Sequence, residues 1–168
     1  GEQPGVALFR TGRGQTADIL AKAEIEHAVG FVDHMRTFVE RLSGRGCRVS
    51  LFIEPDPEQI EASAAIGAAV IELHTGRYAL TEGMSRDEEL ERLIAGATLA
   101  AKRGLEVHAG HGLRFDNVAP IAAIPEVVEL NIGHFLVGEA VFIGLDAAIR
   151  EMRRLMDEAR AASTAPGA

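Results

Sequence analysis

The sequence predicts an α/β fold in which helices cover a parallel β-sheet. From residue 31 onward, short runs rich in β-branched residues alternate four times with segments of helical apolar spacing, a pattern typical of such sheets. Glycine, proline or a capping residue stands at most of the boundaries. Since 47% of the 168 residues are hydrophobic, the chain can bury the core of one domain.

Four strands and five helices are predicted in this part of the chain. The strands cover residues 48–53, 69–74, 105–109 and 127–132. The helices cover residues 31–42, 57 to about 67, 85–104, 118–124 and 145–161. Asp56 is expected to cap the second helix, in a capping box with Gln59. Ser85 and Glu88 are expected to form another capping box.

The two ends of the chain lie outside this alternation. Residues 5–9 could form a strand, whereas the glycine-rich residues 11–16 lack the Lys-Ser/Thr ending of a Walker phosphate loop and favour a flexible connector. The last residues are small and polar, which favours a frayed tail. We therefore divide the chain into an N-terminal segment or connector at residues 1–30, a folded unit at residues 31–161 and a tail at residues 162–168.

Composition and charge narrow the classes of function. The formal charge of −8 argues against a generic nucleic-acid binder, because a phosphate backbone requires a basic face. Cys47 is the only cysteine, and neither a secretory signal nor an apolar run of membrane-spanning length is present. A cytoplasmic location without membrane association is therefore expected. Gly1 is not an initiator methionine, and we expect that the sequence is cut from a longer chain.

Histidines beside glycines end three successive predicted strands. They are His74 on the second strand, His108 and His111 on the third, and His134 after the fourth. Ligands of parallel α/β proteins bind at the carboxyl ends of strands, so these imidazoles are candidates for a functional site. Each one alone is more often a structural histidine bonded to a backbone carbonyl. The glycines on both sides of His111, however, would let a ligand approach the backbone closely.

The same edge of the sheet offers a phosphate site and an acid. Gly133 and His134 precede an apolar turn, where parallel barrels often hold phosphates with backbone N–H groups. Glu72 lies in an apolar strand, where a carboxylate is costly unless a basic residue pairs with it or its pKa is raised for proton transfer. Both interpretations stay open. A metal site formed by Glu72 and the histidines is a further alternative, although no spacing matches a specific ligand motif.

Several of these strand-end motifs match a known family. They include Val49-Ser-Leu-Phe-Ile53, Ile71-Glu-Leu-His-Thr-Gly76, Ala109-Gly-His-Gly-Leu113, Ile121-Ala-Ala-Ile-Pro-Glu126 and Glu129-Leu-Asn-Ile-Gly-His134. On these motifs, residues 46–161 resemble the C-terminal half of pyridoxine 5'-phosphate synthase throughout. The resemblance implies a (β/α)8 TIM-barrel fold, of which this chain holds the C-terminal half, with four βα units and an N-terminal helix.

The resemblance also implies a reaction and its residues. In vitamin B6 biosynthesis, 1-deoxy-D-xylulose 5-phosphate condenses with 3-amino-2-oxopropyl phosphate to pyridoxine 5'-phosphate, inorganic phosphate and water, without a cofactor or a metal. By resemblance, His111 donates a proton and Glu72 stabilises charge that develops in the transition state. Gly112, Gly133 and His134 match the family's contacts to the phosphate of the amino ketone. The implied ligands are therefore small phosphorylated substrates.

The resemblance covers half of a barrel, which usually takes about 250 residues. The motifs of the family's first strands are not found in residues 1–30, and Ala21 or Lys22 stands where the family has a substrate-contacting threonine. An open half-barrel exposes a sheet edge and part of its core, so a homo-oligomer or a partner that supplies the other half is expected. We expect the isolated chain to be inactive. The alternative function is a truncated, non-catalytic phosphate-binding or assembly module of the same fold.

Overall fold

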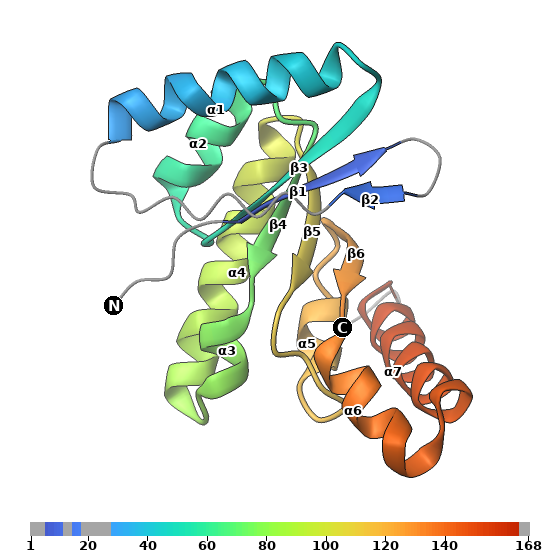
Figure 1. Cartoon of the computed structure of the whole chain (residues 1–168). Helices are drawn as coiled ribbons and strands as arrows, with labels where there is room; N and C mark the ends of the chain where they lie inside the picture. Colours follow the sequence, from blue (N-terminus) through green and yellow to red (C-terminus); the bar gives the residue numbers. More distant parts are fainter. Residues whose placement is uncertain (1–5, 12–14, 18–27, 165–168) are drawn as a thin grey trace.

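The structure, a computed structural model, describes residues 6–11, 15–17 and 28–164. Within these residues the strands form one sheet in the order β2-β1-β3-β4-β5-β6. Their bounds are β1 Val6–Thr11, β2 Gln15–Ala17, β3 Cys47–Ile53, β4 Val70–His74, β5 Glu106–Gly110 and β6 Val127–Asn131. The strands from β3 to β6 are parallel, which confirms the predicted α/β arrangement of four strands alternating with helices (Figure 1).

The described helices include two that the sequence analysis did not predict. Their bounds are α1 Ala28–Ser43, α2 Pro57–Ala65, α3 Gly76–Leu80, α4 Met84–Lys102, α5 Val118–Ala122, α6 His134–Ile143 and α7 Leu145–Thr164. The short α3 was not expected, and α6 was expected to be an apolar turn. Residues 162–164, which were assigned to a frayed tail, continue α7 because alanines favour the helix and the Ser163 hydroxyl donates to the Arg160 carbonyl.

The N-terminal part of the chain adds antiparallel strands to the sheet. β1 pairs antiparallel with β3, with Val6 opposite Phe52, and β2 pairs antiparallel with β1. Residues 6–11 and 15–17 are thus strand rather than connector, and α1 begins three residues before the predicted start. Residues 12–14, in the middle of the glycine-rich stretch, lie outside the described residues, as do Ala21 and Lys22.

The loop after β3 is fixed by the start of α2. Asp56 caps the helix as predicted, because its Oδ1 accepts the N–H groups of Glu58 at 3.0 Å and Gln59 at 3.1 Å. Gln59 does not complete the expected capping box. Its Oε1 instead accepts the N–H of Glu54 at 3.1 Å, and this bond holds the residue that directly follows β3.

The capping box predicted at Ser85 and Glu88 is wrong. α4 begins at Met84, so Ser85 lies inside the first turn and Gly83 is the N-cap without a side-chain cap. Gly83 has φ 57° and ψ −141°, a conformation that only glycine adopts readily. Its carbonyl accepts the N–H groups of Arg86 and Asp87, so the backbone of a glycine starts this helix.

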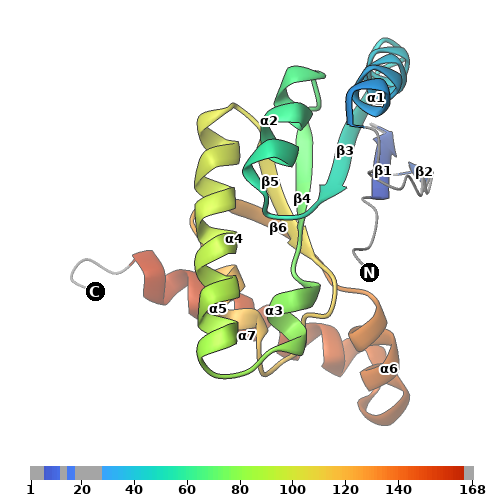
Figure 2. The same ribbon diagram turned by 90° about the vertical axis from the view of Figure 1, so that its left-hand side faces the viewer.

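The sheet has one apolar face and one polar face. α2 and α4 cover the apolar face (Figure 2). The core residues of the strands on this face are Val49, Leu51, Ile53, Ile71, Leu73, Val107 and Ala109. Because side chains alternate along a strand, the intervening residues point to the other face, among them Phe52, Glu72 and His108.

The carboxyl ends of the parallel strands meet at one end of the molecule. α3, α5 and α6 gather there, and α1 lies at the opposite end (Figure 1). α7 packs against α5 and α6 and buries Ala148 and Met152. None of the described helices is both long and apolar enough to cross a membrane.

Candidate functional site

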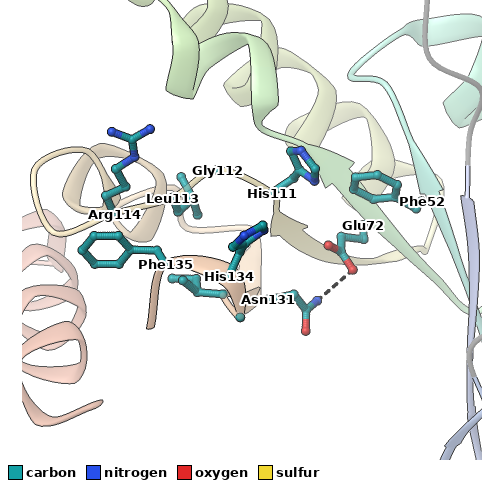
Figure 3. A pocket seen from close by; sticks show the side chains of 11 residues that line it. Phe52, Glu72, His111, Gly112, Leu113, Arg114, Asn131, His134 and Phe135 are labelled. Atoms are coloured by element: carbon teal, nitrogen blue, oxygen red, sulfur yellow. Dashed lines mark hydrogen bonds between the residues drawn. The ribbon is translucent and has the colours of Figure 1, made fainter. Parts of the chain in front are cut away.

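A pocket of about 700 Å³ lies at the carboxyl ends of the parallel strands. Its lining consists of Phe52, Glu72, His111, Gly112, Leu113, Arg114, Asn131, Ile132, Gly133, His134 and Phe135 (Figure 3). All five residues to which the sequence analysis gave a role are among them. His74 and His108, the other strand-end histidines, are not part of the lining. The structure thus brings the proposed residues together, while their roles stay predictions.

Glu72 brings a nearly buried carboxyl group to the pocket. The residue is 6% exposed, and its Oε2 accepts a hydrogen bond from Asn131 Nδ2 at 2.9 Å (Figure 3). Its partner is therefore an amide rather than the basic residue that was one of the two interpretations of the sequence. Burial raises the pKa of Glu72 to about 7; the Asn131 bond opposes this rise, and the charge of Glu129 adds to it. Glu72 can thus gain or lose a proton near neutral pH.

Gly110 provides the space that the Glu72 carboxyl group occupies. A Cβ atom on Gly110 would overlap with Glu72 Oε1 and would lie 2.8 Å from the Asn131 carbonyl oxygen. Ligand access to the backbone was the expected reason for this glycine. In the structure, its close neighbour is the carboxyl group itself.

Gly110→Ala should therefore destabilise the chain and displace Glu72. We expect a loss of about 1–3 kcal/mol in the free energy of unfolding, the usual cost of an added methyl group in a packed site. Urea unfolding followed by circular dichroism measures it. Gly138→Ala is the matched control, because a Cβ on this residue of α6 meets no atom within 4 Å and should not destabilise the helix. Equal stability of the two variants would contradict this packing.

His111 has an unusual backbone conformation that Thr75 stabilises. Its φ of 85° is the only positive value for a non-glycine residue in the described part of the chain. The Thr75 hydroxyl lies 2.7 Å from the carbonyl oxygens of both Gly110 and His111, and the Thr75 N–H donates to Gly110 at 2.8 Å. Thr75 is fully buried, so it can hold this strained turn in place.

The His111 ring lies beside two other rings at the pocket. Its centroid is 4.8 Å from that of His74 and 6.3 Å from that of Phe52. Partial burial lowers the pKa of His111, and the charges of His74 and His134 lower it further. His74 Nδ1 lies 2.6 Å from Glu54 Oε1, and this hydrogen bond lowers the pKa of Glu54. His74 is thus tied to a carboxylate, while the His111 ring remains available to the pocket.

The start of α6 offers donors for an anion. Gly133 is the N-cap, and no side chain caps the helix. The N–H groups of a first turn lack partners within the helix and carry a partial positive charge. A Cβ on Gly133 would meet no atom within 4 Å, so there is open space beside this end. Arg114 and His134 also line the pocket, so the site is suited to a phosphate group.

Sequence reasoning gave no role to Asn131, Phe52 or Arg114, which also line the pocket. The sequence held a signal for Asn131, because it stands at the carboxyl end of the predicted fourth strand, just before Gly133 and His134. Arg114 belongs to a loop, where strand periodicity gives no information.

The alternative metal site of the sequence analysis is not formed. His74 is bonded to Glu54, and His108 is bonded to Glu106 at 2.8 Å and does not line the pocket. In the portion of the chain that the structure covers, no three His, Cys, Asp or Glu side chains are grouped so that they could hold a metal ion.

Fold and site together define an α/β protein with a pocket that contains titratable groups at the carboxyl ends of its parallel strands. The chain belongs to the family described as "Pyridoxal phosphate biosynthesis protein PdxJ", whose sequence profile matches residues 25–158. This confirms the predicted resemblance. The match begins upstream of residue 46 and includes all of α1, where Val29-Gly30 and Asp33-His-Met-Arg36 also resemble the family.

Curated relatives of the chain are named pyridoxine 5'-phosphate synthase. The protein from Ruegeria pomeroyi is 62% identical over 128 residues, which make up 74% of this chain and 52% of the relative. The protein from Jannaschia sp. is 58% identical over 132 residues, 76% of this chain and 53% of the relative. That from Zymomonas mobilis is 56% identical over 134 residues, 80% and 52% respectively. The chain spans about half the length of the curated relatives it matches.

Proposed function

We propose that this chain supplies acid–base and phosphate-binding groups to a pyridoxine 5'-phosphate synthase. The reaction is the condensation of 1-deoxy-D-xylulose 5-phosphate with 3-amino-2-oxopropyl phosphate to pyridoxine 5'-phosphate, inorganic phosphate and water. One observation carries the proposal: Glu72, His111 and the uncapped start of α6 line the same pocket in a member of this family.

Glu72 and His111 are suited to the proton transfers of this reaction. Formation of a Schiff base, loss of phosphate and ring closure each move protons at one site. A carboxyl group with a pKa of about 7 changes protonation near neutral pH, and the imidazole beside it has a pKa that burial lowers from its ordinary value. We assign His111 to proton donation and Glu72 to stabilisation of the charge that develops in the transition state.

The phosphate of the amino ketone is assigned to Gly112, Gly133 and His134. An anion at the start of α6 would accept hydrogen bonds from the backbone N–H groups of the first turn. The open space beside Gly133 and the exposed ring of His134 support this assignment.

Residues from outside this chain are part of the proposal. We propose that the four βα units belong to a (β/α)8 barrel, completed in a homo-oligomer or by a partner that supplies the other half. Exposed apolar side chains at α6 and the start of α7 support a contact of this kind; they are Val137, Val141, Phe142, Ile143, Leu145 and Ile149. The cytoplasmic location stays a prediction from the sequence.

A comparison of two proteins tests the function. One is the chain alone, and the other is a hybrid in which residues 31–161 replace the matching segment of the Ruegeria pomeroyi relative. We expect pyridoxine 5'-phosphate from both substrates with the hybrid and little or none with the chain alone. The product formed by each of the two proteins is measured by chromatography, and growth of a pyridoxine auxotroph reports the same activity in cells.

The outcomes separate the candidate functions. A hybrid that folds and binds inorganic phosphate without turnover would favour the non-catalytic phosphate-binding or assembly module. Turnover by the chain alone would show that these residues suffice for activity, against our expectation. A hybrid that binds neither substrate would contradict both functions.

A further inference from the structure

A row of side chains crosses the polar face of the sheet and passes through Glu72. Phe52, Glu72, His108 and Glu129 are neighbours in register on β3, β4, β5 and β6. In-register residues of parallel strands point to the same face. Phe52 and Glu72 reach the pocket, whereas His108 and Glu129 are not part of its lining. The row therefore connects a pocket residue to polar groups to which the proposed function gives no role.

His108 lies between two carboxylates, those of Glu106 and Glu129. Its side chain is 6% exposed, with Nε2 at 2.8 Å from Glu106 Oε1 and Nδ1 at 3.4 Å from Glu129 Oε1. Glu106 is also paired with Arg48 of β3, and chiefly this bond lowers the pKa of Glu106 to about 2. Glu106 is thus a fixed charge at one end of the group. The imidazole, which is bonded to Glu106, lies on the strand between Glu72 and Glu129.

Glu129 lies on the strand beyond His108, on the same face as Glu72, and does not line the pocket. Burial is the largest cause of the raised pKa of Glu72, and the negative charge of Glu129 raises it further. Among the described residues, Glu129 is the carboxylate whose charge has this effect. We propose that Glu129 is a positioning residue of this site, which acts on Glu72 through its negative charge and is itself held in place by His108.

The other titratable groups around Glu72 come from every strand packed against it. They are Arg48 on β3 and Glu54 directly after it, His74 on β4, Glu106 and His108 on β5, His111 in the loop after β5, and His134 at the start of α6. His74 acts against Glu129, because its charge lowers the pKa of Glu72. Removal of Glu129 would leave this opposing charge in place, so Glu72 would release its proton at lower pH.

This proposal rests on the proposed function, because the proton on Glu72 matters for chemistry only if Glu72 belongs to the reaction site. The test of the proposal, however, does not require turnover. The side-chain carboxyl carbon of Glu72 is followed by NMR in the full chain with isotope-labelled glutamate, as the pH is varied. The signal of Glu72 is identified by its loss in Glu72→Gln. In Glu129→Gln we expect the midpoint of the Glu72 titration to move to lower pH by roughly half a unit or more.

A matched control and a second background make the result specific. Glu126→Gln removes the same charge from the residue before β6, whose carboxylate accepts a hydrogen bond from Thr98 instead, and should leave the midpoint unchanged.

In a His108→Gln background, Glu129→Gln should move the midpoint of the Glu72 titration less, because His108 no longer holds Glu129. An unmoved midpoint in Glu129→Gln, or an equal shift in Glu126→Gln, would overturn the proposal. If the amide group that Glu129→Gln introduces disturbs the NMR spectrum, Glu129→Ala removes the same charge and serves as a second variant. Failure of the synthase assay would leave the titration result intact, so the two proposals fail separately.

Discussion

His111→Ala is expected to lower the kcat of the hybrid enzyme by roughly two to four orders of magnitude, the usual contribution of a positioned acid or base. The variant removes the imidazole from the pocket without changing Glu72 or the start of α6. Product formation at saturating concentrations of both substrates measures the effect. Binding of inorganic phosphate should persist, because the groups assigned to the phosphate remain.

Two further variants separate the imidazole from its unusual backbone conformation. Asparagine tolerates the positive φ of residue 111 and has no group that titrates near neutral pH, so His111→Asn should be as impaired as His111→Ala. His34→Ala removes an exposed histidine from α1, at the other end of the molecule, and should leave the rate unchanged (Figure 1). A hybrid that keeps its full rate as His111→Asn would remove the imidazole from the mechanism.

The sequence predicted the parallel strands well because their signals are local. All four lie within one residue of the predicted limits, since β-branched runs between glycines and caps define them. The convergence of Glu72, His111 and His134 followed from one rule, that the carboxyl ends of parallel strands share an edge.

Other elements could not be predicted because their causes are not local. α6 is apolar on all sides, so no period of polar residues marks it as a helix, and its packing against α7 defines it instead. The pairing of β1 with β3 is a contact between segments distant in sequence. The need for a glycine at position 110 is clear only from the folded structure. There, the Glu72 carboxyl group of the neighbouring strand occupies the space that a side chain on residue 110 would fill.

Glu72 should make the stability of the folded chain fall as the pH rises from about 4.5 to about 7. The pKa of its carboxyl group is raised from 4.5 to about 7 by burial. Between these values the folded chain holds a proton that the unfolded chain has released, so folding is favoured most below pH 4.5 and this contribution is lost above pH 7. The full difference amounts to about 3 kcal/mol in the free energy of unfolding.

Glu72→Gln should remove this pH dependence, because glutamine resembles the protonated carboxyl group and its oxygen can still accept the Asn131 amide. We expect the variant to match the original chain near pH 4 and to exceed its stability near pH 8 by up to about 3 kcal/mol. Urea unfolding at both pH values measures the difference, and Glu91→Gln, an exposed change on α4, controls for the loss of one charge. If Glu72→Gln kept the original slope, the pKa of the Glu72 carboxyl group would be the same in the folded and unfolded chains, and the group would be ionised at neutral pH. It could then hold no proton at neutral pH, and only its assigned role, the stabilisation of charge that develops in the transition state, would remain.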